Sequence, residues 1–286
     1  MVPGSSYNIK ERIRKGELFR KVAISLGSLF GVPLLILTVY AAGTFDFYYF
    51  NPDSVQSNFS LLAKGFTRFL EGAGFDATFQ AFAQKSDFDR KVKEKKPGIV
   101  LVPSWYYQQY GESLGLVPLL VSLENGRPDY RKVLLVRKTR PYTLEELEGK
   151  TVAMTTMGPK TEELLSNTYF KNLGLDFSAM NIIITPKDAD ALYALALGQV
   201  DAALVGQATL DLVGGANSRL LDITQKVASS SPVPAPLLCV VSGSLDRAEI
   251  ERLQKVFLEG RSGKGAGGDL PNYMEMLKIN GWQKPF

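Results

Sequence analysis

The sequence predicts an α/β fold behind a single membrane-spanning helix, and three patterns carry this prediction. Residues 22–42 form an apolar run of 21 residues without a charge. After this run, short strand-like segments alternate with amphipathic helical patterns through the rest of the chain. One strand-like segment, GIVLV at 98–102, is apolar almost throughout, which is typical of strands that a parallel sheet buries on both faces.

The apolar run at 22–42 has the length of a membrane helix, since a bilayer's hydrocarbon core is about 30 Å thick. Residues 1–21 hold six basic residues against two acidic ones, an excess equal to the net charge of +4 for the whole protein. Positive flanks stay in the cytoplasm, so 1–21 is expected to be a cytoplasmic leader and the remainder to face the periplasm. That remainder has 27 basic and 27 acidic residues, which does not favour nucleic acid as a partner.

Two features of the apolar run leave alternatives open. The residues VYA at 39–41 resemble a signal-peptide cleavage site, whereas the long run and long leader favour an uncleaved anchor in the lipid bilayer. Ala23, Gly27 and Gly31 share one smooth helix face, against which a second membrane helix can pack. The alternative is that glycine is simply common in membrane helices.

The residue types that the chain lacks exclude several classes of function. There is no histidine and only one cysteine, Cys239, which excludes histidine-based catalysis, internal disulfides and nearly all zinc and haem sites. The glycine-rich segments carry no phosphate-loop ending. We therefore expect no enzyme, no catalytic residues, no metal and no cofactor.

The first half of the exported part follows a repeated strand–helix order. FDFYYF at 45–50 has the aromatic composition of a strand, and the turn NPDS at 51–54 can start a helix. Apolar residues at helical spacing predict a helix from 59 to the glycines at 72–74. The other elements expected here are strands at 76–82, 98–102, 116–123 and 131–137, and helices at 86–95 and from 104.

The second half repeats this order, which predicts a mainly parallel sheet. The expected elements are helices at 143–147, 160–173, 188–197, 207–213, 246–259 and 270–277, strands at 150–154, 181–185, 201–205 and 237–241, and an extended segment at 218–223. The proline-rich segment SSSPVPAP at 229–236 interrupts the pattern.

Several of these segments resemble the periplasmic substrate-binding proteins of phosphate, phosphite and phosphonate ABC transporters. They are FYYFNPDS, SDFDRKVKEKKPG, IVLVPSWYY, LVPLLVSLENGRPDYRKVLLVRK, YTLEELEGKTVAMTT and ALYALALGQVDAALVG. The resemblance implies a two-lobe periplasmic-binding-protein-like fold with a ligand cleft. It places lobe 1 at 44–138 plus 237–286 and lobe 2 at 140–232, with hinges near 137–141 and 233–236.

In this family the cleft holds an oxyanion through hydroxyls, backbone N–H groups and helix N-termini. The resemblance implies the ligand-binding residues Tyr48, Ser54, Ser104, Tyr106, Thr155, Thr156, Gly158 and Thr161. The alternative is that these aromatic residues pack in the core and these hydroxyls cap helices. The loop TTMGPKT also departs from the family's Ser/Thr-rich turn, since Met157 and Pro159 intrude, and no carboxylate or histidine for a ligand amine is evident.

The expected function is a membrane-anchored, extracytoplasmic solute-binding protein for a phosphate- or phosphonate-like oxyanion. It would serve an ABC transporter or sensor at a bacterial inner membrane. The alternative is an accessory subunit that docks on an integral-membrane protein and binds little or no ligand. The smooth helix face and the altered loop favour this alternative.

Overall fold

The computed structural model describes residues 44–54, 58–260 and 272–285. The elements below all belong to one compact unit within Ala42–Phe286. The membrane helix expected at 22–42 and its face Ala23, Gly27 and Gly31 lie outside the described residues. Within the described residues, no helix combines the length and the apolar character that crossing a bilayer requires.

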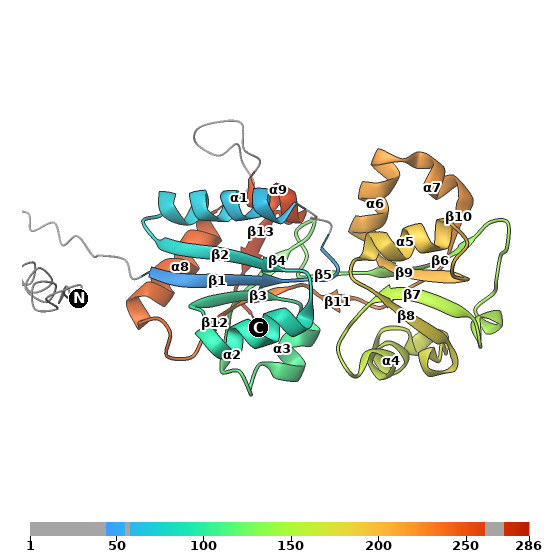
Figure 1. Cartoon of the computed structure of the whole chain (residues 1–286), viewed down its shortest axis with the longest axis horizontal. Helices are drawn as coiled ribbons and strands as arrows, with labels where there is room; N and C mark the ends of the chain where they lie inside the picture. The colour runs from blue at the N-terminus through green and yellow to red at the C-terminus, as the bar shows by residue number, and fades with distance from the viewer. Residues whose placement is uncertain (1–43, 55–57, 261–271, 286) are drawn as a thin grey trace, which may run out of the picture. The chain divides into compact units, whose positions relative to one another are not determined.

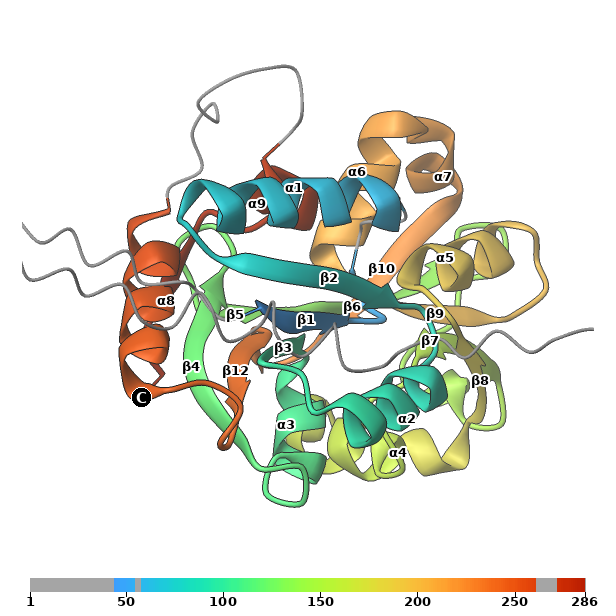
Figure 2. The same ribbon diagram turned by 60° about the vertical axis from the view of Figure 1, so that its left-hand side comes forward.

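A six-stranded sheet, called lobe 1 together with its helices, has the strand order β13-β4-β12-β3-β1-β2 (Figure 1). Its strands are β1 Thr44–Phe50, β2 Asp76–Phe82, β3 Ile99–Val102, β4 Leu116–Leu123, β12 Leu237–Val241 and β13 Gly281–Gln283. Its helices are α1 Phe59–Gly72, α2 Lys85–Lys95, α3 Ser104–Tyr110, α8 Arg247–Glu259 and α9 Tyr273–Leu277. Helix α1 lies over β2 on one side of the sheet and α2 lies on the other (Figure 2).

The aromatic strand β1 builds the core of lobe 1 on both faces of the sheet. Side chains alternate along a strand, so Phe47 and Tyr49 face one way and Tyr48 and Phe50 the other. Phe47 and Tyr49 pack in one apolar cluster with residues of α1, α8 and α9. Tyr48 and Phe50 pack in a second cluster with residues of α2 and α3. The carboxyl end of β1, where the turn at 51–54 follows, is thereby fixed in position.

A five-stranded sheet, called lobe 2 together with its helices, has the order β10-β6-β9-β7-β8. Its strands are β6 Lys132–Arg137, β7 Thr151–Thr155, β8 Asn181–Thr185, β9 Ala202–Gly206 and β10 Thr224–Ser229. Its helices are α4 Thr161–Leu164, α5 Asp188–Ala196, α6 Gln207–Ala216 and α7 Ser218–Ile223, with the short helical turns η2 Glu145–Leu147, η3 Leu165–Tyr169, η4 Lys171–Leu173 and η5 Phe177–Ala179. Strand β9 is buried throughout, and β6 is buried except for Arg137 at its end, as their apolar runs predict.

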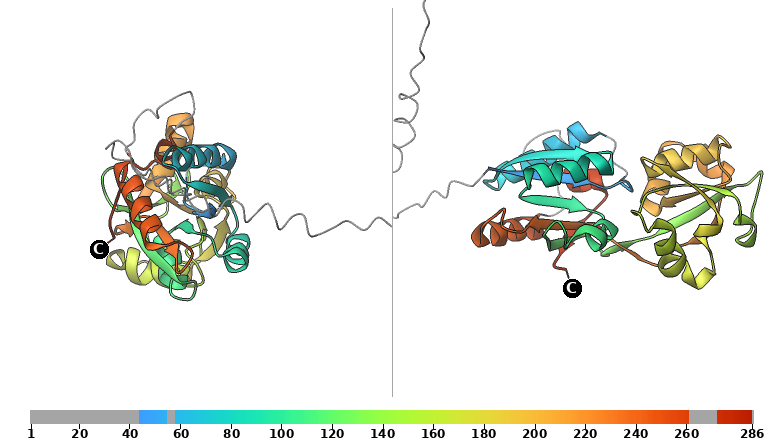
Figure 3. Two further views of the ribbon diagram at one scale, coloured as in Figure 1. Left: turned by 90° about the vertical axis from the view of Figure 1, so that its left-hand side faces the viewer. Right: turned by 60° about the horizontal axis from the view of Figure 1, so that its bottom comes forward.

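Two short strands link the lobes. The chain leaves lobe 1 after β4, passes through β5 Asp129–Tyr130 and enters lobe 2 at β6. It returns from β10 through β11 Val233–Pro234 to β12. The links pair antiparallel as a two-stranded ribbon, and Figure 3 shows them between the sheets.

The structure corrects several expectations about these elements. The sheets are mixed rather than mainly parallel, because β12 runs antiparallel to β3 and β4, and β6 runs antiparallel to β9 and β10. These strands adjoin the links, where the chain changes lobe without a helical crossover. The segment expected to be extended is helix α7, in which Leu220 is buried and accepts a hydrogen bond from the Thr224 hydroxyl at 2.9 Å.

The helix expected at 160–173 is broken into α4 and the turns η3 and η4. The N–H of Phe170 donates to the carbonyl of Leu165 at 2.8 Å, a π-type bond that inserts one residue into the turn. This insertion buries both Tyr169 and Phe170, at 4% and 1% exposure. Core packing therefore explains the break.

The first link also lies earlier in the chain than expected. The sequence places 131–137 in lobe 1 with a hinge at 137–141, whereas β6 belongs to the sheet of lobe 2. Glu124 and Arg127 form an isolated antiparallel bridge, after which the chain passes through β5 into lobe 2. The second link coincides with the expected segment at 233–236.

Candidate ligand-binding site between the two lobes

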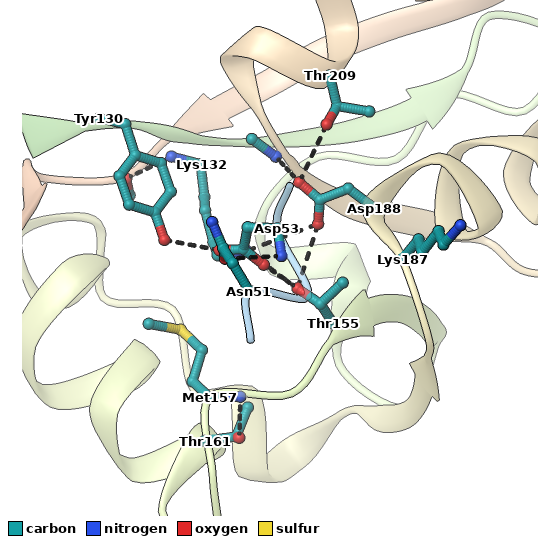
Figure 4. Close-up of polar contacts among 12 residues, drawn as sticks. Asn51, Asp53, Tyr130, Lys132, Thr155, Met157, Thr161, Lys187, Asp188 and Thr209 are labelled. Carbon is teal, nitrogen blue, oxygen red and sulfur yellow. Dashed lines mark hydrogen bonds and ion pairs between the residues drawn. The ribbon is translucent and has the colours of Figure 1, made fainter. Parts of the chain in front are cut away.

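One ammonium group is completely buried between the lobes. Lys132 starts β6 and its side chain has no exposed surface. Its Nζ lies 2.8 Å from a carboxylate oxygen of Asp53, 3.7 Å from one of Asp188 and 3.2 Å from the hydroxyl of Thr155 (Figure 4). Asp53 and Thr155 are within hydrogen-bond distance of the ammonium, and Asp188 adds an ion pair at longer range.

The carboxylate of Asp53 is the centre of this cluster. Asp53 comes from lobe 1, in the turn after β1, where its N–H donates to Asn51 Oδ1 at 3.2 Å. Its carboxylate accepts hydrogen bonds from the Tyr130 hydroxyl at 2.6 Å and from the Thr155 hydroxyl, in addition to the Lys132 ammonium. In Figure 4 these three side chains point toward Asp53. One carboxylate of lobe 1 is thus held by donors from the first link and lobe 2.

Asp188 forms the far side of the cluster. It is the first residue of α5 and is fully buried. Its second carboxylate oxygen accepts the N–H of Gly206 at 2.5 Å and the hydroxyl of Thr209 at 3.5 Å. The backbone N–H of Lys132 donates to the buried hydroxyl of Ser230 at 2.9 Å. These bonds fix the ammonium and the second carboxylate from behind.

Burial and mutual attraction set the charges of the cluster in opposite directions. Burial opposes ionisation of Asp53, but the Lys132 ammonium and three hydrogen bonds hold the pKa of Asp53 below its ordinary value. Burial also opposes the charge of Lys132, but the carboxylates of Asp188 and Asp53 raise its pKa. Burial raises the pKa of Asp188 to about 7, with Asp53 adding to the rise and Lys132 opposing it. At neutral pH, Asp53 and Lys132 are therefore ionised and Asp188 is partly protonated.

A small cavity of about 60 Å³, with space for a few atoms, lies beside this cluster and is lined in part by Asp53 and Tyr130. Its walls come from lobe 1, both links and lobe 2. They are formed by Tyr49, Asn51, Asp53, Ser54, Leu101, Ser122, Glu124, Tyr130, Gly206, Ala208, Ala235, Pro236, Leu277 and Ile279. Burial, followed by the nearby Asp211 and Asp129, raises the pKa of Glu124.

The residues expected to bind ligand in lobe 1 and the strand β7 are only partly brought together. Thr155 belongs to the cluster, and Ser54 lines the cavity. Tyr48 and Tyr106 lie in the core of lobe 1 and donate to Asp46 at 3.0 Å and Asp89 at 2.7 Å. Ser104 donates to the carbonyl of Pro234 in the second link at 2.7 Å. Ligand contact by these residues remains a prediction.

In the loop after β7, at 156–161, the groups expected to bind an anion form hydrogen bonds mainly within the loop. The hydroxyl of Thr161 accepts the N–H of Met157 at 2.8 Å and donates to the carbonyl of Gly158 at 2.6 Å. The hydroxyl of Thr156 accepts the N–H of Gly158 at 3.0 Å. Two N–H groups expected to bind an anion thus have partners within the loop, while the Met157 carbonyl accepts the Gln109 side chain from lobe 1 at 2.8 Å.

Four residues of the cluster were missed by sequence reasoning. Lys132 opens an otherwise apolar strand, KVLLV, and a charge in such a position is a signal that could have been followed. Asp53 and Asp188 were interpreted as parts of a turn and of a helix start. Tyr130 lies just before the strand expected at 131–137 and was assigned no role. Their meeting depends on the first link, which the sequence placed too late.

Comparison with known proteins agrees with this architecture. No curated protein matches the chain. The family model described as "ABC transporter, phosphonate, periplasmic substrate-binding protein" matches residues 42–284.

Solved structures share the fold at low sequence identity. A binding-protein component of an ABC phosphonate transporter from Pseudomonas aeruginosa is 14% identical with a TM-score of 0.68, and the match covers 85% of this chain and 82% of that one. PhnD1 from Prochlorococcus marinus, in complex with methylphosphonate, is 10% identical with a TM-score of 0.65, covering 85% and 92%. The chain therefore belongs to the family of phosphonate-type periplasmic substrate-binding proteins of ABC transporters.

Proposed function

We propose that this chain binds a small phosphonate-type oxyanion between its lobes and presents it to the membrane component of an ABC transporter. The observation that carries the proposal is the convergence of Lys132, Thr155 and Tyr130 on a single carboxylate. A phosphonate offers the same negatively charged acceptor oxygens, for which charged and hydroxyl donors are suited.

The charges of the cluster indicate how such a ligand binds. With Asp53 in place, one ammonium already faces two carboxylates, and a further anion would meet repulsion. A phosphonate that takes the place of the Asp53 carboxylate meets Lys132, Tyr130 and Thr155 directly. Protonated Asp188 can then donate a further hydrogen bond.

Family membership supports this ligand class and an extracytoplasmic location. The solved protein from Prochlorococcus marinus was in complex with methylphosphonate, which makes methylphosphonate a suitable first probe. The anchor predicted at 22–42 would hold the module at the membrane surface beside the transporter. That tether remains a prediction.

Calorimetric titration of the full chain with methylphosphonate, phosphate, phosphite and sulfate tests the proposal. We expect saturable binding of methylphosphonate. In the Asp53→Ala background, where no carboxylate competes for the Thr155 hydroxyl, Thr155→Val should weaken this binding about 10- to 100-fold, because a hydrogen bond to a charged group contributes about 1.5–3 kcal/mol. Thr44→Val, which removes an exposed hydroxyl bonded to Asp76, is the matched control and should bind normally. Equal affinity in both variants would contradict the site.

An accessory subunit of a membrane complex is the second candidate, and the same Asp53 contact favours it. A carboxylate of the chain itself satisfies the donors and joins the lobes. In this case the folded full chain gives no heat with any of the four anions. It also co-purifies with an integral-membrane protein.

A further inference from the structure

We propose that Asp53 is a built-in competitor, whose carboxylate occupies the anion position until an external anion displaces it. The inference rests on the proposed function for the identity of the displacing ligand. The anion position itself is defined independently, by the donors that surround Asp53.

The burial of the contact distinguishes it from an ordinary surface ion pair. Lys132 and Thr155 have no exposed surface, and the Asp53 side chain is 5% exposed. Tyr130, whose hydroxyl completes the set, is only partly buried as a residue. Three donors around one carboxylate form the arrangement that proteins use for a bound oxyanion. The chain thus places its own carboxylate in a site built for an anion.

The backbone around Asp53 allows the carboxylate to leave. Asp53 stands beyond the end of β1 and takes part in no strand pairing, since the ladder of β1 with β2 ends at Phe50. The turn is instead held by Asn51, which accepts the N–H of Asp53 through its side chain and that of Ser54 through its carbonyl. Withdrawal therefore breaks the three bonds of the carboxylate and leaves the sheet intact.

The contact also connects two lobes that touch elsewhere through weaker bonds. Gln109 donates to the Met157 carbonyl, and the Lys187 ammonium lies 5.6 Å from the centre of the Phe59 ring. In Figure 4 Lys187 points away from the cluster, so it does not neutralise Asp53. Asp53 is the charged, buried bridge among these contacts, and its loss should free both the anion position and the lobes.

Asp53→Ala in the full chain tests the inference, with acetate and methylphosphonate as probes and chloride at the same ionic strength as the salt control. We expect acetate to raise the melting temperature of the variant but not that of the native protein, because acetate replaces the missing carboxylate. We also expect methylphosphonate to bind Asp53→Ala at least tenfold more tightly than the native chain, since the competitor is gone. Asp87→Ala, which removes an exposed carboxylate of α2, makes the same change in charge and should behave as native.

The outcomes separate this inference from the proposed function. Acetate stabilisation of Asp53→Ala without methylphosphonate binding to either protein supports the competitor and contradicts the phosphonate ligand. Equal methylphosphonate affinity for both proteins supports the ligand and overturns the competitor. If Asp53→Ala does not fold, the same two measurements are made on Asp53→Asn, which keeps the side-chain shape and removes the charge. Failure of both variants to fold even in acetate also overturns the inference, because a free anion then cannot replace Asp53.

Discussion

Replacing Lys132 with methionine should destabilise the protein strongly, and the loss should grow with pH. Methionine keeps most of the side chain's volume but removes the ammonium that lies 2.8 Å from Asp53 and 3.7 Å from Asp188. Breaking a buried pair by removing one partner typically costs about 3–5 kcal/mol, because a buried charge is left without compensation. In the variant, the carboxylates of both Asp53 and Asp188 lose this compensation.

Protonation removes the uncompensated charge of a buried carboxylate, and this determines the sign of the pH dependence. In the native protein Asp188 has a pKa raised to about 7, so its contribution to stability is lost as the pH rises from about 4 to about 7. Without Lys132 the pKa of Asp53 should also rise above its ordinary value. Asp53 then becomes a second carboxylate whose contribution to stability is lost as the pH rises. The variant should therefore lose about 1.4 kcal/mol more per pH unit than the native protein over that range.

Urea unfolding at pH 5, 6 and 7, followed by the fluorescence of the buried Trp105 and Trp282, measures this difference. The loss should be small at pH 5 and reach several kcal/mol at pH 7. Lys255→Met is the control, since its pair with Glu259 is long and exposed and should contribute less than about 1 kcal/mol. A loss for Lys132→Met that is below about 1 kcal/mol and independent of pH would refute the reasoning.

Three further predictions concern the neighbours of the cluster. In Asp188→Asn the fall in the free energy of unfolding between about pH 4 and pH 7 should shrink, because a group with a raised pKa of about 7 is gone; an unchanged urea profile would contradict this. Gly158→Ala should cost more than about 1 kcal/mol in thermal unfolding, since φ is 89° and a Cβ would meet the Gln109 side chain. Gln109→Ala should cost about 1 kcal/mol through its lost bond to Met157 and should make Gly158→Ala less damaging, which a double-mutant cycle measures.

Apolar runs and periodicity in the sequence predicted most elements, as in β2, along which exposed and buried residues largely alternate. The strands expected at 76–82, 116–123 and 181–185 have those same bounds in the structure. The extended segment predicted at 218–223 was wrong, because a six-residue helix with one buried leucine shows no clear hydrophobic period. The α/β class and the two-lobe fold were confirmed by the family match.

The site was harder to predict because it depends on contacts far apart in the chain. Asp53 and Thr155 are 102 residues apart, and nothing local relates them. Hydroxyls that look available in the sequence, such as those of Thr156 and Thr161, bind their own loop. A capping or turn role satisfies a short polar side chain as well as a ligand does, so residue type alone could not separate the two.

The ribbon of the two links restricts how the lobes can move against each other. Val233 pairs with Tyr130, and the N–H of Ala235 donates to the Pro128 carbonyl at 2.8 Å, so sliding of one link past the other would break this ladder. Bending keeps these bonds and changes only backbone torsions beside them. We therefore expect the two links to bend together as one joint rather than to slide past each other. Because Tyr130 belongs to this joint and also holds Asp53, we expect a change in the angle between the lobes to be coupled to the proposed release of the carboxylate.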